Sequence, residues 1–234
     1  MNSKTITRDE LTKIIDHTFL KAYASKEDLE RICREADENH FAMVAVNSSS
    51  VKLCKKLLAN SDVHVGAAIS FPLGQTTIAV KEFETIQAIK EGADEIDYVI
   101  NIGEVKNGNY SYIEREMSSI VNLCKSNHVI SKVIFENCYL TKDEIKKVAL
   151  IAKKVEPDFI KTSTGFGSGG ALVEDVELMK SIVGETVKIK AAGNIRNWET
   201  TSLMIDAGAS RIGTSSALDI LKEYDKEKNL GVYI

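Results

Sequence analysis

The sequence predicts a single (β/α)8 TIM barrel spanning residues 1–234, with an extra helix at its N-terminal end. Three observations favour this fold. The length of 234 residues suits one large α/β domain. Short apolar runs rich in β-branched residues alternate with helical patterns about 10–15 residues long, as in a parallel sheet. Eight such runs can be counted, and no linker rich in serine and glycine divides the chain.

The apolar runs define the expected strands. In chain order they are Ile14–Asp16, Phe41–Val46, His64–Ile69, Glu95–Ile100, Lys132–Glu136, Asp158–Lys161, Val187–Ala191 and Arg211–Gly213. The main alternative is an open, doubly wound sheet. The GxGxxG pattern that such a sheet uses to bind dinucleotides is missing after the first strand, which favours the closed barrel.

Helix boundaries support the same alternation. A capping box pairs a hydroxyl residue with Glu or Asp three positions later at a helix start. The pattern occurs at Thr7 with Glu10, Ser25 with Asp28, Ser111 with Glu114, and Thr141 with Glu144. Each of two helical patterns is followed by a glycine and then a strand, so Gly92 and Gly208 are expected to end these helices in left-handed conformation.

Charge and composition exclude several function classes. The net charge is −4, and 27% of the residues are charged, with no polybasic segment. Neither a nucleic acid nor a membrane surface is therefore expected as a partner. The first residues lack the apolar stretch of a secretory signal, and no run is long enough to span a membrane. We expect a cytoplasmic protein.

Cysteines and histidines predict neither a disulfide framework nor a metal site. The four cysteines are scattered and form no CxxC pair, so reduced thiols are expected. The four histidines show no ligand-type spacing with them, so no metal is expected. His17 is better explained as a structural hydrogen-bond partner than as a general acid, Cys138 as a passive thiol, and Trp198 as a packing residue. The last residues, "LKEYDKEKNLGVYI", predict a solvated helix end with a loose terminus.

Charged residues stand at the ends of several expected strands, where a barrel of this type carries its active site. They are Asp16, Asp97, Lys132, Glu136, Lys161, Lys188 and Lys190. Alternate residues of a strand share a face, so Lys188 and Lys190 point the same way and only one need reach the mouth. Charges inside a barrel are costly unless they pair, shift their pKa or take part in chemistry.

Lys161, in "DFIKTSTGFGSGG", is the candidate nucleophile. A lysine amine has an ordinary pKa of about 10.4, and desolvation or a neighbouring cation lowers it. Lys190 is expected on the adjacent strand at the same depth. One amine could then attack a carbonyl as a Schiff-base nucleophile while the other stays charged. The alternative is that both lysines are only salt-bridged to Asp97, Asp16 or Glu136.

Loops rich in glycine and hydroxyl residues follow the last three expected strands. They read "STGFGSGG", "AAGN" and "GTSSA". Loops in this part of a barrel, together with the start of a following helix, commonly bind phosphate. Glycine lets backbone N–H groups approach an anion closely, and Ser215 and Ser216 can also donate. The three loops together predict a phosphate site.

These residues carry a resemblance to a known family. The segments "IDHTFLK", "FPLG", "EGADEIDYVINIG", "KVIFE", "DFIKTSTGFG", "KIKAAG", "IR" and "RIGTSS" cover most of the chain. In this order they resemble the deoxyribose-phosphate aldolases, which are class I aldolases. The resemblance implies that Lys161 forms the Schiff base, that Lys190 lowers its pKa, and that Asp97 relays protons through an ordered water.

The resemblance also implies the substrate contacts. Asp16, Thr18, Lys132 and Thr162 match the polar residues around the substrate. The positions that match the family's phosphate site are Gly165, Gly167, Gly193, Arg196, Gly213, Ser215 and Ser216. The chain departs from the family pattern at four positions near strand ends: Ser48 for proline, Ser70 for glycine, Asn137 for threonine, and Asn194 for the second glycine of a pair. Asparagine tolerates left-handed geometry, so the loop at Asn194 is expected to survive.

The implied reaction is the reversible cleavage of 2-deoxy-D-ribose 5-phosphate to acetaldehyde and D-glyceraldehyde 3-phosphate in deoxyribonucleotide catabolism. It needs no metal and no cofactor, because an iminium ion takes the place of the metal electrophile. A homodimer is kept open as the assembly. Two alternatives remain. The first is a different enzyme on the same barrel, either a phosphosugar isomerase with Glu136 as its base or another class I aldolase. The second is a phosphosugar-binding protein without turnover.

Overall fold

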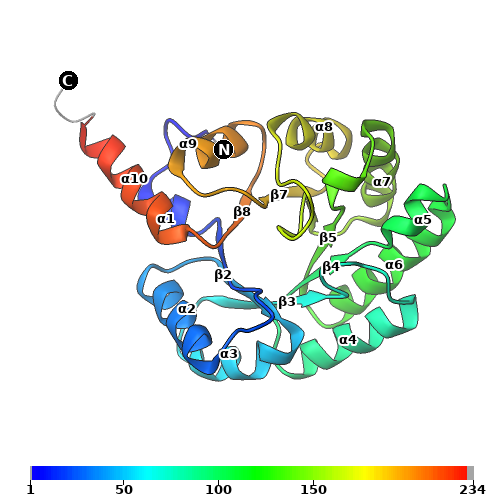
Figure 1. The fold of residues 1–234 in the computed structure, drawn as a ribbon, viewed down its shortest axis with the longest axis horizontal. Helices are drawn as coiled ribbons and strands as arrows, with labels where there is room; N and C mark the ends of the chain where they lie inside the picture. The colour runs from blue at the N-terminus through cyan, green and yellow to red at the C-terminus, as the bar shows by residue number, and fades with distance from the viewer. Residues whose placement is uncertain (1, 231–234) are drawn as a thin grey trace.

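The computed structural model describes residues 2–230 and shows a closed barrel. Its strands run in chain order around the ring, and each pairs in parallel with the next until β8 meets β1 (Figure 1). The strands are β1 (Ile15–Thr18), β2 (Met43–Asn47), β3 (His64–Ile69), β4 (Glu95–Val99), β5 (Ile130–Ile134), β6 (Phe159–Lys161), β7 (Lys188–Ala192) and β8 (Arg211–Thr214). The predicted (β/α)8 fold is confirmed.

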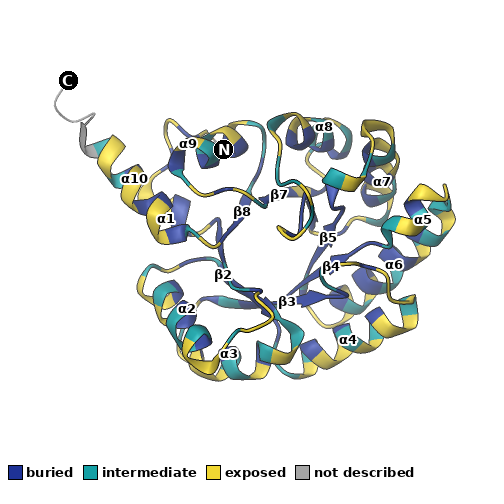
Figure 2. Cartoon of the chain, in the orientation of Figure 1, coloured by how far each residue is buried: buried dark blue, intermediate teal, exposed yellow. Residues whose placement is uncertain are grey.

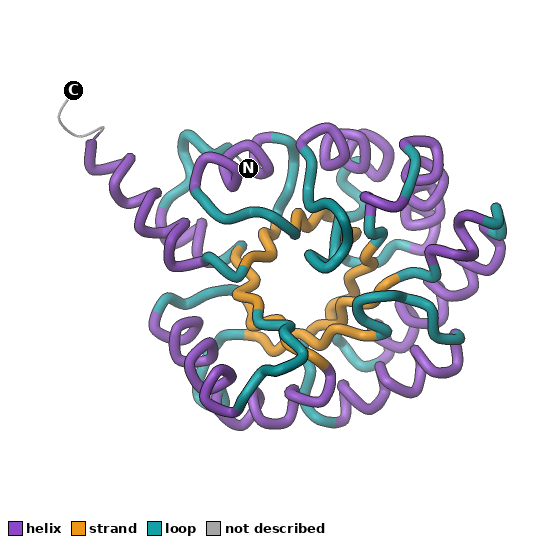
Figure 3. The backbone as a smooth tube through the Cα atoms, in the orientation of Figure 1, coloured by secondary structure: helices purple, strands orange, loops and turns teal. Residues whose placement is uncertain are grey.

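Helices surround the strand ring, as Figure 3 shows. They are α1 (Arg8–Thr12), α2 (Lys26–Glu38), α3 (Val51–Leu57), α4 (Ile78–Lys90), α5 (Ile102–Lys106), α6 (Tyr110–Ser126), α7 (Lys142–Val155), α8 (Val173–Val183), α9 (Trp198–Asp206) and α10 (Ala217–Leu230). Two short 3-10 turns, η1 (Ser48–Ser50) and η2 (Asn137–Tyr139), follow β2 and β5. Helix α1 precedes β1 and is the extra N-terminal helix that the sequence predicts.

The helix caps show which local signals decided the boundaries. Thr7, Ser25 and Thr141 each form the predicted capping box. The prediction at Ser111 is wrong, because the cap of α6 is Asn109, two residues earlier, which accepts from the Tyr112 N–H. Gly92 and Gly208 follow helix ends with φ of 102° and 111°, as expected.

The fifth strand differs from its predicted range. It begins at Ile130 and ends at Ile134, so Glu136 lies beyond the strand rather than at its end. Glu136 has a left-handed φ of 56°, which turns the chain out of the extended conformation. The Phe135 N–H still donates to the Lys161 carbonyl of β6, and the Glu136 carboxylate accepts from the Thr164 N–H in the loop after β6.

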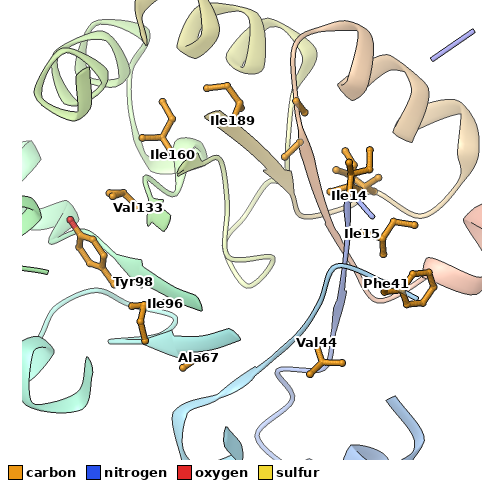
Figure 4. Close-up of a cluster of buried hydrophobic side chains, with 14 of the residues drawn as sticks. Ile14, Ile15, Phe41, Val44, Ala67, Ile96, Tyr98, Val133, Ile160 and Ile189 are labelled. Atoms are coloured by element: carbon orange, nitrogen blue, oxygen red, sulfur yellow. The ribbon is translucent and has the colours of Figure 1, made fainter. Parts of the chain in front are cut away.

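The apolar core lies between the strand ring and the helices. Outward-facing strand residues such as Val44, Ile96, Tyr98, Ile160 and Ile189 are fully buried there (Figure 4). Figure 2 shows the strands buried and the outer helix faces exposed. Burying one such side chain contributes about 1.5–3 kcal/mol. Because alternate residues face opposite ways, these apolar positions force the residues between them into the barrel interior.

The end of the chain is only partly as predicted. Trp198 packs edge-on against Tyr224 of α10, with ring centroids 4.9 Å apart, so its packing role agrees with expectation. Leu221 and Tyr224 are buried, so this part of α10 is not solvated on all sides. The predicted loose terminus, residues 231–234, lies outside the described residues. Within residues 2–230, no helix is both long and apolar enough to cross a membrane.

Candidate active site

A cavity of about 370 Å³ opens at the C-terminal end of the barrel. The ends of β1, β6, β7 and β8 and the loops that follow them form its wall, and the loop after β6 reaches over the opening of the strand ring (Figure 1). Lys161 lies at its base, while Gly193, Arg196 and Ser215 line its outer part. The cavity therefore joins the predicted nucleophile to the predicted phosphate loops.

Lys161 has the surroundings that an amine nucleophile requires. It is the last residue of β6, only 4% exposed, and its Nζ donates to Asp97 Oδ2 at 2.8 Å. Burial lowers its pKa to about 8; Asp97 opposes the shift, and Lys190 and Lys132 add to it. At neutral pH roughly a tenth of the Lys161 side chains are then free amine, against roughly 0.03% at the ordinary value.

Asp97 is a carboxylate shared by three lysines. Its Oδ1 accepts from Lys132 at 2.8 Å, and its Oδ2 accepts from Lys161 at 2.8 Å and from Lys190 at 2.7 Å. Burial alone would raise the pKa of Asp97, but these three cations hold it well below its usual range. Asp97 therefore stays ionised and fixes the positions of both candidate catalytic lysines.

Lys190 lies directly beside Lys161, because the two residues are register partners on β7 and β6. Its ammonium is fully buried and contacts both Asp97 and Asp16. Gly213, on the neighbouring strand, leaves room for its stem. A Cβ at Gly213 would lie 3.1 Å from Lys190 Cε and 2.9 Å from Ala192 Cβ. The glycine is therefore required by close packing.

The outer part of the cavity has the features of an anion site. Gly165 and Gly193 have φ of +85° and +89°, which L side chains rarely adopt. Asn194 follows with φ of 60°, so it takes the left-handed geometry expected of it. Arg196 is exposed on the cavity wall and supplies a positive charge. Ser215 lies just before α10, whose N-terminal dipole favours an anion.

Comparison with known proteins shows which family has this arrangement of a buried lysine and glycine-rich loops. A sequence model of DeoC/LacD family aldolases matches residues 11–223. The chain belongs to this aldolase family. A deoxyribose-phosphate aldolase of Lactobacillus acidophilus is 59% identical over 214 residues, which cover 92% of this chain and 90% of the relative. Another, of Bacteroides thetaiotaomicron, is 49% identical over 220 residues, with 94% and 92% covered.

Solved structures of DeoC/LacD-type aldolases agree. A structure described as the unique tetrameric structure of deoxyribose phosphate aldolase from Aeropyrum pernix has a TM-score of 0.88 at 29% identity, covering 94% of this chain and 93% of its own. A second, described as "QR15, an Aldolase", has a TM-score of 0.88 at 38% identity, covering 94% and 98%. The barrel and its chain order are therefore those of these aldolases.

Several residues that match the aldolase pattern lie outside the cavity wall. Asp16 and Lys132 lie beneath it in the barrel interior and are fully buried. Thr162 bridges β6 and β7, with its hydroxyl donating to Ala192 O at 3.1 Å and accepting from Ala192 N at 3.2 Å. Ser216 does not line the cavity either, and its N–H donates to Thr214 Oγ1 at 2.9 Å.

Gly167 lies in the loop after β6 but does not line the cavity that Gly165, Gly193 and Ser215 line. It lines a second pocket of about 450 Å³ together with Glu136. A Cβ at Gly167 would lie 2.7 Å from Cys138 Sγ and 3.1 Å from Glu136 Cδ, so the glycine permits close packing against the turn after β5. Thr164 and Phe166 line both pockets and separate them.

Glu136 is occupied in holding the loop after Lys161. Its Oε1 accepts from the Thr164 N–H at 3.1 Å, and its Oε2 contacts the Thr164 hydroxyl. Thr164 Oγ1 in turn accepts from the Phe166 N–H at 3.0 Å. A carboxylate engaged in this way is poorly placed to act as the base of an isomerase.

Two cationic side chains on the cavity wall were not predicted from the sequence. Lys21 lines the cavity, and its Nζ lies 5.6 Å from the centroid of the Phe166 ring. Arg31 comes from α2 and also lines it. Lys21 ends the segment "IDHTFLK" after β1, so its place at a strand end was a usable signal. Arg31 had none, because only the packing of α2 brings it there.

The remaining predicted side chains have ordinary structural partners. His17 Nε2 lies 2.7 Å from Glu35 Oε2, and burial lowers the pKa of His17. All four cysteines are free thiols. Across residues 2–230, no three His, Cys, Asp or Glu side chains are grouped so that they could hold a metal ion.

The departures from the aldolase pattern are partly linked to one another. Ser48 Oγ donates to Glu84 Oε1 at 2.7 Å, and the Ser70 N–H donates to Glu84 Oε2 at 2.8 Å. Ser70 takes a left-handed φ of 50°, the geometry in which the family usually has glycine. Asn137 is buried after β5, with its Nδ2 3.4 Å from Met179 Sδ.

Proposed function

We propose that the chain is a class I aldolase that reversibly cleaves 2-deoxy-D-ribose 5-phosphate into acetaldehyde and D-glyceraldehyde 3-phosphate. The observation that carries the proposal is Lys161, a buried amine with a pKa lowered to about 8 at the base of a cavity whose outer wall suits a phosphate. The names of the most similar relatives agree with this substrate.

Cleavage begins with Lys161. Its free amine adds to the aldehyde at C1, and loss of water leaves a protonated iminium ion. A base removes the proton from the C3 hydroxyl, the C2–C3 bond breaks, and its electron pair moves into the iminium to form an enamine. Glyceraldehyde 3-phosphate leaves. Protonation at C2 and hydrolysis of the resulting iminium then release acetaldehyde and restore the amine.

Asp97 and Lys190 have distinct parts in this scheme. The side chain of Lys190 lies beside Lys161 and disfavours a positive charge on it. The low pKa of Asp97 makes it a poor place to store a proton, so it acts by passing protons between water and substrate and by holding both lysines. Asp16 and Lys132 keep Lys190 and Asp97 in place through the contacts between them.

The phosphate of the substrate is assigned to the outer cavity. Gly165, Gly193 and Ser215 can offer backbone or hydroxyl donors there, and Arg196 offers a charge. Lys21 adds a second cation from the loop after β1. Gly213 contributes room for Lys190 on the same wall. Thr18 also lines the cavity and is assigned to the sugar hydroxyls.

The experiment that tests the proposal is borohydride trapping with acetaldehyde, followed by peptide mass mapping. A reduced two-carbon adduct should form on Lys161, with no other lysine modified at comparable yield. An adduct on Lys190 would reverse the two roles. Absence of any adduct would favour the isomerase or the binding protein. Exhaustive chelation should leave cleavage of the phosphosugar unchanged, and a loss that zinc restores would overturn the class I mechanism.

Assembly and location remain predictions. A homodimer is kept open for the assembly, and the Aeropyrum pernix relative is described as tetrameric. Sedimentation of the purified chain distinguishes the two. The expected cytoplasmic location agrees with a phosphorylated substrate and with reduced cysteines. Cell fractionation would test it.

A further inference from the structure

Six charged side chains form a closed ring of ion pairs inside the barrel, below Lys161. In order around the ring they are Glu95, Lys132, Asp97, Lys190, Asp16 and Arg211. Every neighbouring pair is in contact, and Arg211 closes the ring by reaching Glu95 at 3.2 Å. All six residues are buried, on strands β1, β4, β5, β7 and β8.

The ring is balanced in charge without Lys161. It holds the carboxylates of Asp16, Glu95 and Asp97 and an equal number of cations, so its formal charge is zero. Lys161 touches it only through Asp97 and is an additional lysine beyond the balanced set. A proton on Lys161 therefore has no carboxylate of its own in this part of the barrel. A charge in such surroundings is costly, and it is removed most easily by loss of the proton.

The other members are held in their charged forms. Arg211 does not lose its proton in proteins. Burial works against a charged Lys132, but Asp97 and Glu95 outweigh it and raise its pKa. Burial would raise the pKa of Glu95, but Lys132, His64 and Arg211 lower it instead. The pKa of Lys132 is raised, whereas the pKa of Lys161, which contacts the same carboxylate, is lowered.

We propose that Glu95 and Arg211, which lie in the ring away from Lys161 and contact neither it nor the cavity, are positioning residues that set in opposite directions how readily Lys161 loses its proton: the Arg211 cation favours the free amine, and the Glu95 anion opposes it. They act through the charge balance of the ring. This inference rests on the proposed function only to explain why control of Lys161 is useful, because a Schiff-base enzyme needs one neutral lysine. Stability alone is a weak reason for such a ring, because well-packed apolar residues commonly stabilise a core as much as buried ion pairs do.

His64 connects the ring to solvent. Its Nδ1 lies 2.8 Å from Glu95 Oε1, and its side chain is half-exposed at the N-terminal end of β3. The bond to Glu95 and the nearby Asp94 carboxylate raise the pKa of His64. Burial and the Arg211 cation lower it, but the net shift is upward. The charged groups that face Lys161 are Asp97, Lys190 and Lys132. His64 thus offers a place where the ring charge can be changed from the surface.

The test compares Glu95→Gln, Arg211→Gln and the double variant. The free-amine fraction of Lys161 is measured against pH by competitive labelling with acetic anhydride and peptide mapping, which requires no aldolase activity. Removing the Glu95 anion should shift the labelling curve to lower pH. Removing the Arg211 cation should shift it to higher pH. Each shift should be about half a unit or more, or roughly threefold in free amine. The double variant, again balanced, should return close to wild type.

Opposite shifts distinguish charge balance from a merely structural role, which would move both single variants in the same direction. Shifts of the labelling curve in the same direction in both single variants, or no shift in either, would overturn the inference. Circular dichroism checks folding. Where a single variant does not fold, variants at the half-exposed His64 take its place. His64→Lys should shift the labelling curve of Lys161 to lower pH, and His64→Glu should shift it to higher pH. Acetaldehyde trapping on the wild type is run separately, so a failure of the proposed function leaves the labelling result intact.

Discussion

Replacing Lys190 with leucine would test how the lysine pair works. The ammonium of Lys190 is fully buried between Asp97 and Asp16, and it lies beside Lys161 in the barrel register. Lys190→Leu keeps most of the stem volume and removes the charge. Lys161 then loses a neighbouring cation, and Asp97 Oδ2 is left to Lys161 alone, because Lys132 bonds to Oδ1. Both changes raise the pKa of Lys161.

The structure sets the size of this effect. The pKa of Lys161 is lowered from 10.5 to about 8, and the difference of 10.5 − 8 = 2.5 units is the most that can be restored. That corresponds to about 3.4 kcal/mol, or roughly 300-fold less free amine. Burial is the largest cause of the shift and persists in the variant. We therefore expect a loss of roughly 10- to 100-fold in activity at neutral pH.

The assay is a pH–rate profile for cleavage of the phosphosugar. Lys190→Leu should recover part of its activity as the pH rises toward the ordinary lysine value, whereas Lys161→Leu should recover none. Lys188→Leu is the matched control, because Lys188 lies on the same face of β7 two residues earlier but is exposed. Circular dichroism would confirm folding, since Lys190→Leu leaves Asp16 with Arg211 as its remaining cation.

Two results would contradict this reasoning. If Lys190→Leu folds and keeps the wild-type profile, Lys190 does not control the ionisation of Lys161, and it serves only as an ion-pair partner. A loss of activity that is the same at every pH would also contradict the charge mechanism. It would point to misplacement of Asp97 or of the substrate.

Three further predictions follow from the same geometry. Lys161 has a folded pKa of about 8 and an unfolded one near 10.5, so the native state binds fewer protons between these values and wild-type stability rises with pH across that window. Lys161→Leu should accordingly be more stable than wild type at neutral pH, by up to about 3 kcal/mol in free energy of unfolding. In thermal or denaturant unfolding, the difference in stability between variant and wild type should narrow toward high pH. A variant less stable than wild type at neutral pH would contradict this prediction. Gly213→Ala should crowd Lys190, cost about 1–3 kcal/mol and move the pH–rate profile to higher pH, while an unchanged profile would show that the strand yields. Arg196→Leu should raise KM for the phosphosugar roughly tenfold with acetaldehyde trapping unchanged, and equal loss of both would remove Arg196 from the phosphate site.

Local sequence signals predicted much of the fold. Alternation of apolar and other residues, as in "EIDYVI", places Ile96 and Tyr98 against the helices, which leaves Asp97 inside the barrel. Capping boxes at Thr7 and Thr141 act over a few residues and formed as expected. Where two local signals competed, the prediction failed: Asn109 outcompeted Ser111 as the cap of α6.

The candidate site likewise contains features that could be predicted from the sequence and features that could not. Lys161 and Lys190 could be predicted to lie side by side, because each is at a comparable place in its own βα unit and adjacent parallel strands pair in register. The turn at Glu136 could not, since its left-handed backbone comes with bonds to Thr164, 28 residues away. Gly167 was likewise assigned to a phosphate loop by its composition, whereas the packing of Cys138 decides its place.

The sequence by itself determined which charges enter the barrel, and the tertiary structure decided how they pair. The period of two along each strand is a property of the backbone, so the inward set can be read from the chain alone. Asp97 meets Lys132, Lys161 and Lys190 across separations of 35, 64 and 93 residues. Those contacts depend on closure and strand stagger, which bring side chains from non-adjacent strands together in the interior. The burial and the neighbouring lysines that lower the pKa of Lys161 exist only once the barrel is closed.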